Sequence, residues 1–325
     1  SLERTRKITA IVLDKTGTIT EGKPEVVESV GLDDVEVASV LFAIETRSEH
    51  PLAEAVVRYL QPRTSHITAH TSHFDSQTGK GVKATVDGTT WLVGNRRLLE
   101  ENGISIGAEY RDKEKTWQEH AHTVVWVADA KEVRAAIAIA DRIKPSAAEA
   151  IARLKASGIQ VYMQTGDSRR TAQAVAKAVG IDDFRSEVLP RDKATFVVGL
   201  QQMGHVVAMV GDGINDCEAL AKADVSIAMG HGSDIAMDVA RITLISTDLN
   251  AVPRAIVLSR KTVSFIRQNL FWAFIYNVLG IAIAAGVLYP VNGFLLDPMI
   301  AGAAMALSSV SVVSNSLRLK AVRLN

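Results

Sequence analysis

The chain has 325 residues, more than a single hydrophobic core usually accommodates, so we expect two or more domains. Its 36 basic and 36 acidic residues cancel, which removes the electrostatic argument for nucleic acid, and we expect no nucleic-acid partner. The single cysteine, Cys217, excludes an internal disulfide framework and a cysteine-rich zinc site. Neither a methionine nor a signal-peptide pattern opens the chain, so we interpret it as a piece of a longer protein.

Most of the chain alternates between short apolar runs and helical stretches. Residues 8–13 form an apolar run that ends at Asp14 and a glycine turn, which is typical of a buried parallel strand. Similar runs end near residues 164, 210 and 228, with alanine-rich helical stretches between them. This alternation predicts a doubly wound α/β fold, whose ligands collect beyond the carboxyl ends of the strands. Five residues should therefore converge at one rim: Asp14, Thr165, Asp167, Asp212 and Asp216.

Residues 30–134 have a different pattern, with shorter, more polar strands and frequent turn residues, which predicts an inserted α+β domain. Within it, Ser48-Glu49-His50-Pro51 precedes a helical stretch, and Pro51 suits a first helical turn. The two residues before Pro51 can cap that helix or hold a nucleotide. Nearby glycines at 79 and 81 would allow the backbone to approach a flat base or a phosphate closely.

Two long apolar segments, residues 271–289 and 299–317, predict a two-helix transmembrane hairpin. Basic residues precede the first segment and follow the second, which predicts that both ends and the soluble part are cytoplasmic. Burial of both helices in a large soluble core is the alternative. We therefore predict a doubly wound domain at 1–29 and 135–258, the insertion at 30–134, and a stalk with the hairpin at 259–325.

The strand ends carry groups suited to phosphoryl transfer. Asp14 lies on a tight turn whose N–H groups can hold a phosphoryl group while its carboxylate attacks. A carboxylate that meets the γ-phosphate of ATP needs a divalent cation, and Asp212 offers a hard oxygen ligand for Mg²⁺. Lys193 could neutralise charge on the phosphoryl oxygens, while Thr165 and Gly166 donate hydrogen bonds to them. Taken singly, an aspartate at a strand end is also compatible with a helix cap.

Three motifs taken together resemble the phosphorylation-domain signatures of P-type ATPases. They are Asp14-Lys15-Thr16-Gly17-Thr18-Ile19-Thr20, Thr165-Gly166-Asp167 and Gly211-Asp212-Gly213-Ile214-Asn215-Asp216. The resemblance implies a haloacid-dehalogenase-like fold in which Asp14 is phosphorylated, Lys193 binds the phosphate, and Asp14 and Asp212 hold Mg²⁺. We also predict that Thr16 contacts both Mg²⁺ and the nucleotide, and that Asp216 is a catalytic residue. A soluble phosphatase of this fold, the first alternative, would carry a second aspartate where this chain has Thr16.

The inserted domain resembles the nucleotide-binding domain of heavy-metal-transporting P-type ATPases, in which the pair His50-Pro51 marks the subclass. This resemblance implies that ATP lies near Glu49, His50, Gly79, Gly81 and Asn95. The chain departs from the family at Ala84, where a third glycine is usual, and at Cys217-Glu218, where alanine-proline is common. The histidines at 66, 70 and 73 have no cysteine or acid cluster nearby, so we predict no metal site there.

Polar groups within the apolar segments indicate the transported ion. Met305, Ser308 and Ser309 share one helix face, and a thioether favours copper(I) over zinc or magnesium. A gap-filling methionine beside close-packing serines is the alternative. Together with Tyr276-Asn277, this motif resembles the membrane signatures of the copper(I) subgroup, which implies copper(I) ligation by Tyr276, Asn277, Met305 and Ser309. A zinc or cadmium pump would carry a lysine and an aspartate in these segments.

As a whole, the resemblance implies ATP-driven copper(I) export through an aspartyl-phosphate, by an integral membrane protein of a bacterial inner or plasma membrane. The family's first half, with its actuator domain and Cys-Pro-Cys helix, is not in this sequence, and full turnover requires it. The expected partners are therefore ATP, Mg²⁺, copper(I), the lipid bilayer, that missing half and a copper chaperone. A nucleotide-binding regulatory fragment without turnover is the second alternative.

Overall fold

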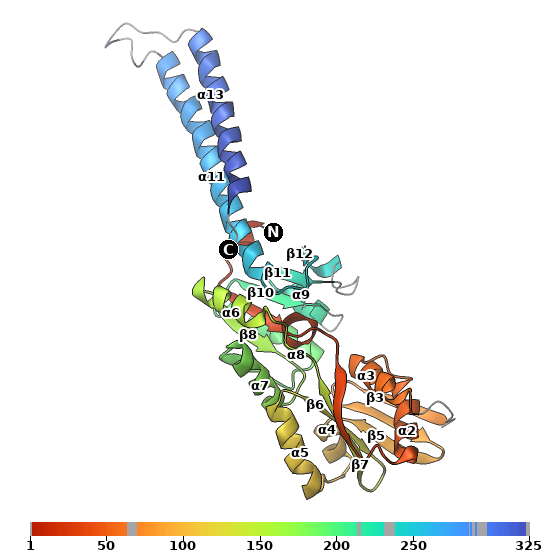
Figure 1. The fold of residues 1–325 in the computed structure, drawn as a ribbon. Coiled ribbons are helices and arrows are strands. Elements are labelled where there is room, and N and C mark those ends of the chain that lie inside the picture. The colour runs from red at the N-terminus through yellow and green to blue at the C-terminus, as the bar shows by residue number, and fades with distance from the viewer. Residues whose placement is uncertain are drawn as a thin grey trace. The chain divides into compact units, whose positions relative to one another are not determined.

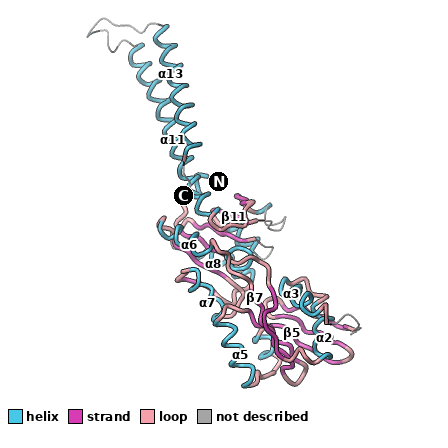
Figure 2. Tube along the Cα trace, in the orientation of Figure 1, coloured by secondary structure: helices cyan, strands magenta, loops and turns pink. Residues whose placement is uncertain are grey.

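The structure, a computed structural model, describes residues 2–63, 70–212, 216–230, 238–285, 287, 290 and 298–322. The chain divides into two compact units, residues 8–251 and residues 1–7 with 252–325. In the described part of the chain, the first unit contains two six-stranded sheets with helices on their faces (Figures 1 and 2). The second unit consists mainly of two long helices.

The first sheet is parallel throughout and has the strand order β12-β11-β10-β1-β8-β9. Its strands are β1 (Ala10–Asp14), β8 (Gln160–Gln164), β9 (Asp183–Arg185), β10 (Val207–Gly211), β11 (Val225–Met229) and β12 (Ile242–Leu244). The helices between them are α6 (Ala147–Ala156), α7 (Arg169–Val179), α8 (Pro190–Gln202) and α9 (Cys217–Lys222). This arrangement confirms the predicted doubly wound α/β sheet. The chain order reverses between β1 and β10, where open α/β sheets bind their ligands.

Burial on both faces explains why β10, and β1 up to Asp14, are continuously apolar. Every residue of β1, β10 and β11 is buried. On one face, α8 and α9 pack against the strands, so that Val197 and Leu220 join Val12 and Met209 in one core. A strand covered on both faces carries few polar side chains before its end, and Ser226 is the exception in β11. The polar residues of this sheet therefore gather at its carboxyl edge.

The second sheet is antiparallel and has the order β2-β7-β6-β5-β4-β3. Its strands are β2 (Glu25–Val30), β3 (Thr71–Gln77), β4 (Gly81–Val86), β5 (Thr89–Gly94), β6 (Thr123–Ala128) and β7 (Val133–Ala140). The helices are α2 (Val35–Glu45), α3 (Pro51–Leu60), α4 (Arg96–Glu101) and α5 (Ala108–Glu119). Successive strand residues alternate between two cores, because Trp91 packs on the side of α2 and α3 and Leu92 on the side of α4 and α5.

The second sheet is inserted between β1 and β8 of the first. It extends from Glu25 to Ala140, beyond the predicted limits of 30 and 134 at both ends. The four-part division of the chain stays a prediction. Ala84, at the position of the family's third glycine, is 1% exposed and packs in the core beneath α2 and α3, where a methyl group fills space that glycine would leave.

The second unit contains α1 (Leu2–Thr5), α11 (Ala251–Ala284), α13 (Pro298–Leu317) and a short 3₁₀ turn (Arg318–Ala321). Asn269 Nδ2 of α11 donates to Ser316 Oγ at 2.8 Å, and Asn315 Nδ2 of α13 donates to Asn269 Oδ1 at 2.8 Å. A run of large apolar side chains is nevertheless exposed on both helices. It includes Leu270, Phe271, Phe274, Val278, Leu279, Ile281, Leu307, Val310, Val313 and Leu317.

Among the described residues, no helix combines the length and the apolar character needed to cross a membrane. The predicted transmembrane hairpin is therefore not confirmed. Residues 286, 288 and 289 of the first predicted span lie outside the described residues.

The end of β8 contains a buried amide that the fold leaves unpaired. Gln164 is opposite Asp14 in the β1–β8 register and 0% exposed, and neither its Nε2 nor its Oε1 has a hydrogen-bond partner in the described structure. An unpaired buried polar group costs about 1–3 kcal/mol.

We expect Gln164→Leu to raise the free energy of unfolding by about 1–2 kcal/mol in urea denaturation. The exposed Gln173→Leu on α7 is the control and should change it by less than about 0.5 kcal/mol. A loss of stability in Gln164→Leu would contradict this account.

Candidate functional site

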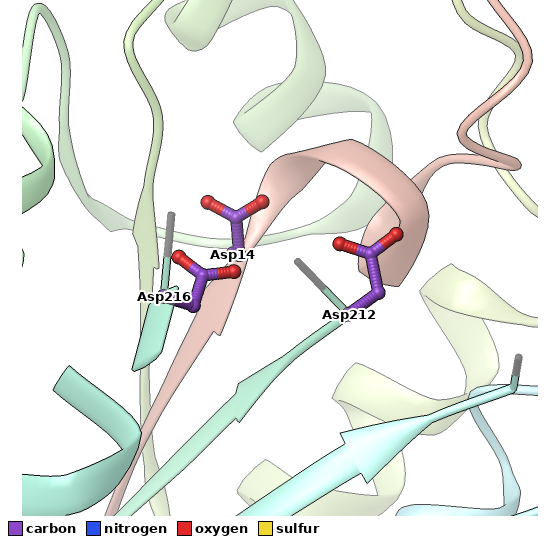
Figure 3. A group of neighbouring side chains, drawn as sticks. All are labelled: Asp14, Asp212 and Asp216. Carbon is purple, nitrogen blue, oxygen red and sulfur yellow. The ribbon is translucent and has the colours of Figure 1, made fainter. Parts of the chain in front are cut away.

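Three carboxylates meet where the chain order of the parallel sheet reverses. Asp14 ends β1, Asp212 directly follows β10, and Asp216 precedes α9. One carboxylate oxygen from each residue lies within 4.8 Å of the other two (Figure 3). Asp14 and Asp216 are 5% and 2% exposed, so water screens this cluster poorly. Three of the five residues expected at this rim thus form one cluster, while Thr165 and Asp167 follow β8, the neighbour of β1 at the same edge.

Lys193, near the start of α8, supplies the positive charge that faces the cluster. Its Nζ donates to Asp14 Oδ1 at 2.6 Å and to Asp216 Oδ1 at 2.7 Å. Burial by itself lowers the pKa of Lys193, but the charges of Asp14 and Asp216 outweigh burial and raise it. Lys193 therefore remains an ammonium held in a fixed direction, and its role in binding phosphate stays a prediction.

One lysine does not neutralise three carboxylates. Burial, and then the charge of Asp14, raises the pKa of Asp212 to about 6. The same two causes raise the pKa of Asp216 to about 7, although Lys193 opposes them. Three carboxylates within 4.8 Å of one another leave negative charge that Lys193 does not balance, and a divalent cation would relieve it. Converging carboxylate oxygens are the ligands that Mg²⁺ prefers, so the donor set fits this ion.

The turn after Asp14 is packed directly against Asp212. Residues Lys15–Ile19 form this turn, on which Thr16 is half-buried and Gly17 has a φ of 70°. A Cβ on Gly17 would lie 1.4 Å from Asp212 Oδ2, and one on Gly211 would lie 2.5 Å from Asp216 Oδ2. Glycine is required at both places because any side chain would displace a carboxylate of the cluster.

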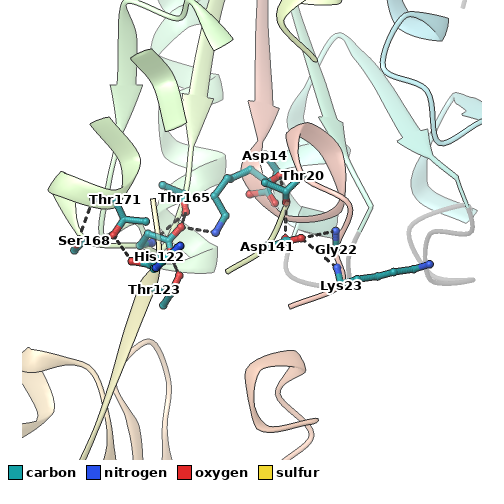
Figure 4. A network of polar contacts seen from close by, with 12 residues as sticks. Asp14, Thr20, Gly22, Lys23, His122, Thr123, Asp141, Thr165, Ser168 and Thr171 are labelled. Carbon is teal, nitrogen blue, oxygen red and sulfur yellow. Dashed lines mark hydrogen bonds and ion pairs between the residues drawn. The ribbon is translucent and has the colours of Figure 1, made fainter. Parts of the chain in front are cut away.

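Two residues that sequence reasoning missed hold this turn in place through hydrogen bonds. Lys144 Nζ donates to the Gly17 carbonyl at 2.6 Å. Asp141 accepts from Thr20 Oγ1 at 2.5 Å and from the backbone N–H of Gly22 at 3.0 Å (Figure 4). Both residues belong to the segment that leaves β7. The sequence offered one signal for them: an acidic and a basic residue stand shortly before Pro145, where a strand ends.

Thr165 and Gly166 follow β8, but the hydroxyl of Thr165 points to Asp167 and not to Asp14. Thr165 Oγ1 donates to Asp167 Oδ2 at 2.9 Å, and Lys15 Nζ lies 2.5 Å from the same oxygen. Burial alone would raise the pKa of Asp167, but the charge and hydrogen bond of Lys15, with hydrogen bonds from Thr123 and Thr165, lower it. Asp167 therefore lies at the predicted rim but pairs with Lys15 and is not a member of the three-carboxylate cluster.

The predicted nucleotide residues fall into two groups. Asn95 Nδ2 donates to the Gly79 carbonyl at 2.8 Å, and Gly81 pairs with Gly94 so closely that a Cβ on Gly81 would lie 2.2 Å from the Val93 carbonyl oxygen. Gly79, Gly81 and Asn95 are therefore one cluster at the end of the inserted sheet.

The second group lies at the start of α3. His50 caps this helix, its Nδ1 accepting from the Leu52 N–H at 3.2 Å, and Glu49 and His50 are exposed. Among the described residues, no hydrogen bond or ion pair joins this group to the glycine cluster.

Glu45 is a further candidate that sequence reasoning missed. It ends α2, one helical turn before Ser48, and is 7% exposed. Burial raises its pKa to about 7. A buried carboxyl group of this kind favours a partner that donates hydrogen bonds. The only sequence signal was an acidic residue at the end of an apolar helical stretch.

The predicted copper ligands are not gathered by the two long helices. Tyr276 Oη lies 3.4 Å from Ser311 Oγ across the helix pair. Asn277 Nδ2 donates to Ala273 O of its own helix, and Ser309 Oγ donates to Met305 O of its own helix. Met305 is 69% exposed. The copper site stays a prediction that needs ligands from outside these two helices.

Comparison with known proteins agrees with the motifs. A family model described as haloacid dehalogenase-like hydrolase matches residues 8–224, and a second of that description matches residues 200–256. The "Probable copper-transporting ATPase PacS" of Synechococcus elongatus is 49% identical over 98% of this chain and 43% of its own length. The "Copper-exporting P-type ATPase" of Legionella pneumophila is 47% identical over 100% of this chain and 44% of its own length. The chain thus spans less than half the length of these relatives.

A solved structure has the same architecture. The crystal structure of a zinc-transporting PIB-type ATPase in the E2.Pi state superposes with a TM-score of 0.65 at 32% identity, covering 98% of this chain and 51% of that one. The resemblance indicated by the three motifs is thereby confirmed.

The raised pKa of Asp212 predicts pH-dependent binding of Mg²⁺. Below about pH 6 a proton occupies this carboxylate and competes with the ion, so apparent affinity should fall up to about tenfold for each further pH unit. We expect Mg²⁺ to raise the melting temperature at pH 7.5 and to have little effect at pH 5. Asp212→Asn should lose the effect at both values, whereas the exposed Asp33→Asn should retain it. An equal effect of Mg²⁺ at both pH values would refute this role of Asp212.

Proposed function

Because the chain belongs to the haloacid dehalogenase-like hydrolase family, we propose that Asp14 takes the γ-phosphoryl group of ATP and forms an aspartyl-phosphate. The observation that carries the proposal is the buried contact of Lys193 with Asp14 at 2.6 Å, beside Asp212 and Asp216. A carboxylate held by an ammonium and surrounded by metal-ligating groups is suited to approach a polyanion.

In the proposed reaction, one oxygen of Asp14 attacks the γ-phosphorus. The bond to the bridging oxygen of the β-phosphate breaks, and ADP leaves. Lys193, aligned by Asp14 and Asp216, donates to the oxygens of the transferred group, and Gly166 is proposed to add a hydrogen bond. The proposed hydrogen bond from Thr165 requires its hydroxyl to leave Asp167 first. Mg²⁺, when held by Asp14, Asp212 and Thr16, would offset the repulsion between the carboxylate and the phosphates.

The inserted domain is proposed to bind ATP through Glu49, His50, Gly79, Gly81 and Asn95. The close pairing of Gly81 with Gly94 leaves backbone that a planar base can approach. The exposed residues Glu49 and His50 form the second proposed nucleotide group, at the start of α3. The buried Glu45 adds a hydrogen-bond acceptor at the end of the preceding helix.

The transport function is proposed from the relatives and from the helix pair. Relatives named as copper-transporting and copper-exporting ATPases support copper(I) export, and Met305 offers a soft ligand. The exposed apolar side chains of α11 and α13 support a membrane location, with residues 8–251 in the cytoplasm. Tyr276, Asn277, Met305 and Ser309 are the proposed copper residues.

This proposal implies several partners. Because the chain spans less than half the length of its relatives, we propose that an actuator domain and a Cys-Pro-Cys helix complete the pump. The further proposed partners are the lipid bilayer and a copper chaperone. A zinc or cadmium pump is the alternative that the zinc-transporting structure favours. A regulatory fragment that binds nucleotide without turnover is the second alternative.

Phosphorylation can be tested on the chain itself. With γ-labelled ATP and Mg²⁺, we expect an acid-stable label that hydroxylamine removes, as for an acyl phosphate. The label should approach one per chain and decay slowly, because Thr16 stands where a soluble phosphatase has its second aspartate. Asp14→Asn should carry no label, whereas the exposed Asp33→Asn should label like the wild type. Rapid multiple turnover by the wild-type chain would instead identify a phosphatase.

Ion preference can be tested by competition with a chromogenic copper(I) chelator under anaerobic conditions. We expect the detergent-solubilised chain to hold copper(I) more tightly than Zn²⁺, and Met305→Leu to weaken copper(I) binding about tenfold or more, because the soft thioether is lost. Met203, at the end of α8, is 68% exposed against 69% for Met305, so Met203→Leu is a matched control that should change nothing. Preference for Zn²⁺, or an unchanged Met305→Leu, would exclude the copper(I) assignment.

A further inference from the structure

The inserted domain touches the parallel sheet at a point away from its two chain connections. β6 begins at Thr123, whose Oγ1 donates to Asp167 Oδ1 at 2.8 Å. One residue earlier, the carbonyl of His122 accepts from Thr171 Oγ1 of α7 at 3.0 Å (Figure 4). Two hydroxyl groups thus join the inserted sheet to the loop after β8 and to the helix that follows it.

The acceptor of the first bond is itself tied to the phosphorylation turn. Asp167 uses its other oxygen, Oδ2, for Lys15 Nζ at 2.5 Å and for Thr165 Oγ1 at 2.9 Å. The side chains of Lys15 and Asp167 are 9% and 10% exposed, so this ion pair is shielded from water. Lys15 is the residue after Asp14. A continuous chain of contacts therefore leads from the inserted domain, through Asp167 and Lys15, to the nucleophile.

We infer that Thr123 is a positioning residue, a hydroxyl latch that fixes the inserted domain against Asp167 and thereby aligns bound ATP with Asp14. This inference rests on the proposed phosphoryl transfer. Thr123 belongs to neither group of predicted nucleotide residues, and it does not contact Asp14 or Lys193. Its effect must therefore act through the placement of the domain and through the Asp167–Lys15 pair.

A hydroxyl can control the alignment because the covalent connections alone allow rotation. The covalent connections between the inserted domain and the parallel sheet are the segments at 20–24 and 141–146, which flank β2 and β7. The domain also contacts the rest of the first unit where α5 packs against α7, so the Thr123 bond acts together with that packing. Phosphoryl transfer is sensitive to misplacement of the reacting atoms by about 1 Å. The hydrogen bond from Thr123 to Asp167 has a buried, ionised acceptor, and such hydrogen bonds are stronger than those between neutral groups. Its loss would leave Asp167 Oδ1 with one donor fewer.

The latch predicts a separation of ATP binding from phosphorylation. Thr123→Val keeps the side-chain shape and removes the hydroxyl. We expect the rate of label transfer at saturating ATP to fall about tenfold, while the ATP concentration at half-maximal rate changes less than about twofold. Thr123→Ser, which restores the hydroxyl, should recover most of the rate. Thr116→Val is the matched control, because the Thr116 hydroxyl is exposed and bonds only to Asp112 O of its own helix.

A second measurement does not depend on activity. Amide hydrogen exchange of the turn Lys15–Ile19 and of the start of β6 should be faster in Thr123→Val than in the wild type, Thr123→Ser or Thr116→Val. If the wild type takes no label, the proposed phosphoryl transfer is wrong, and amide hydrogen exchange becomes the only test of the latch. The latch is overturned if exchange at both segments is unchanged in Thr123→Val. It is also overturned if Thr123→Ser is as slow as Thr123→Val, since side-chain volume would then be the cause.

Discussion

The arrangement of the site depends on the crowding of Asp14, Asp212 and Asp216 around one ammonium group at the edge of a parallel sheet. Three carboxylates so close together repel one another, and burial strengthens that repulsion. Lys193 offsets part of it through two short hydrogen bonds. The remaining negative charge makes this edge receptive to a divalent cation, and through that cation to a phosphate group. The two glycines that crowd the cluster exist because the carboxylates occupy the space a side chain would need.

The convergence of Asp14 and Asp212 could be predicted because both end buried parallel strands, and such ends meet at one rim. The motifs also indicated Lys193 as a cation of this site, although its pairing with Asp14 comes from the structure. The direction of Thr165 was not predicted, because its hydroxyl bonds to Asp167, two residues away in the same loop, and the motif was interpreted through its phosphate role alone. Likewise, nothing local in the sequence indicated that Lys15 turns away from its neighbour Asp14 to pair with a residue more than a hundred positions later.

The inserted domain and the helix pair show the limits of local patterns. The boundaries at 30 and 134 were placed where the strand pattern becomes obvious, whereas β2 and β7 continue outward to Glu25 and Ala140 because they pair with each other. Gly79, Gly81 and Asn95 form one cluster because a hairpin pairing brings them together. Helical spacing places Met305 and Ser309 on one face, but spacing within one helix cannot specify which other helix contributes the remaining ligands.

The adjacency of β2 and β7 has an evolutionary consequence. Since the entering and leaving strands are hydrogen-bonded neighbours, the chain departs from the parent sheet and returns to it about one strand spacing away, roughly 5 Å. The parallel sheet therefore needs to accommodate only two neighbouring attachment points, as it would for a short surface loop, although more than a hundred residues are inserted between them. Such a module can be gained, exchanged or remodelled without altering the order of the strands that end at the carboxylate cluster.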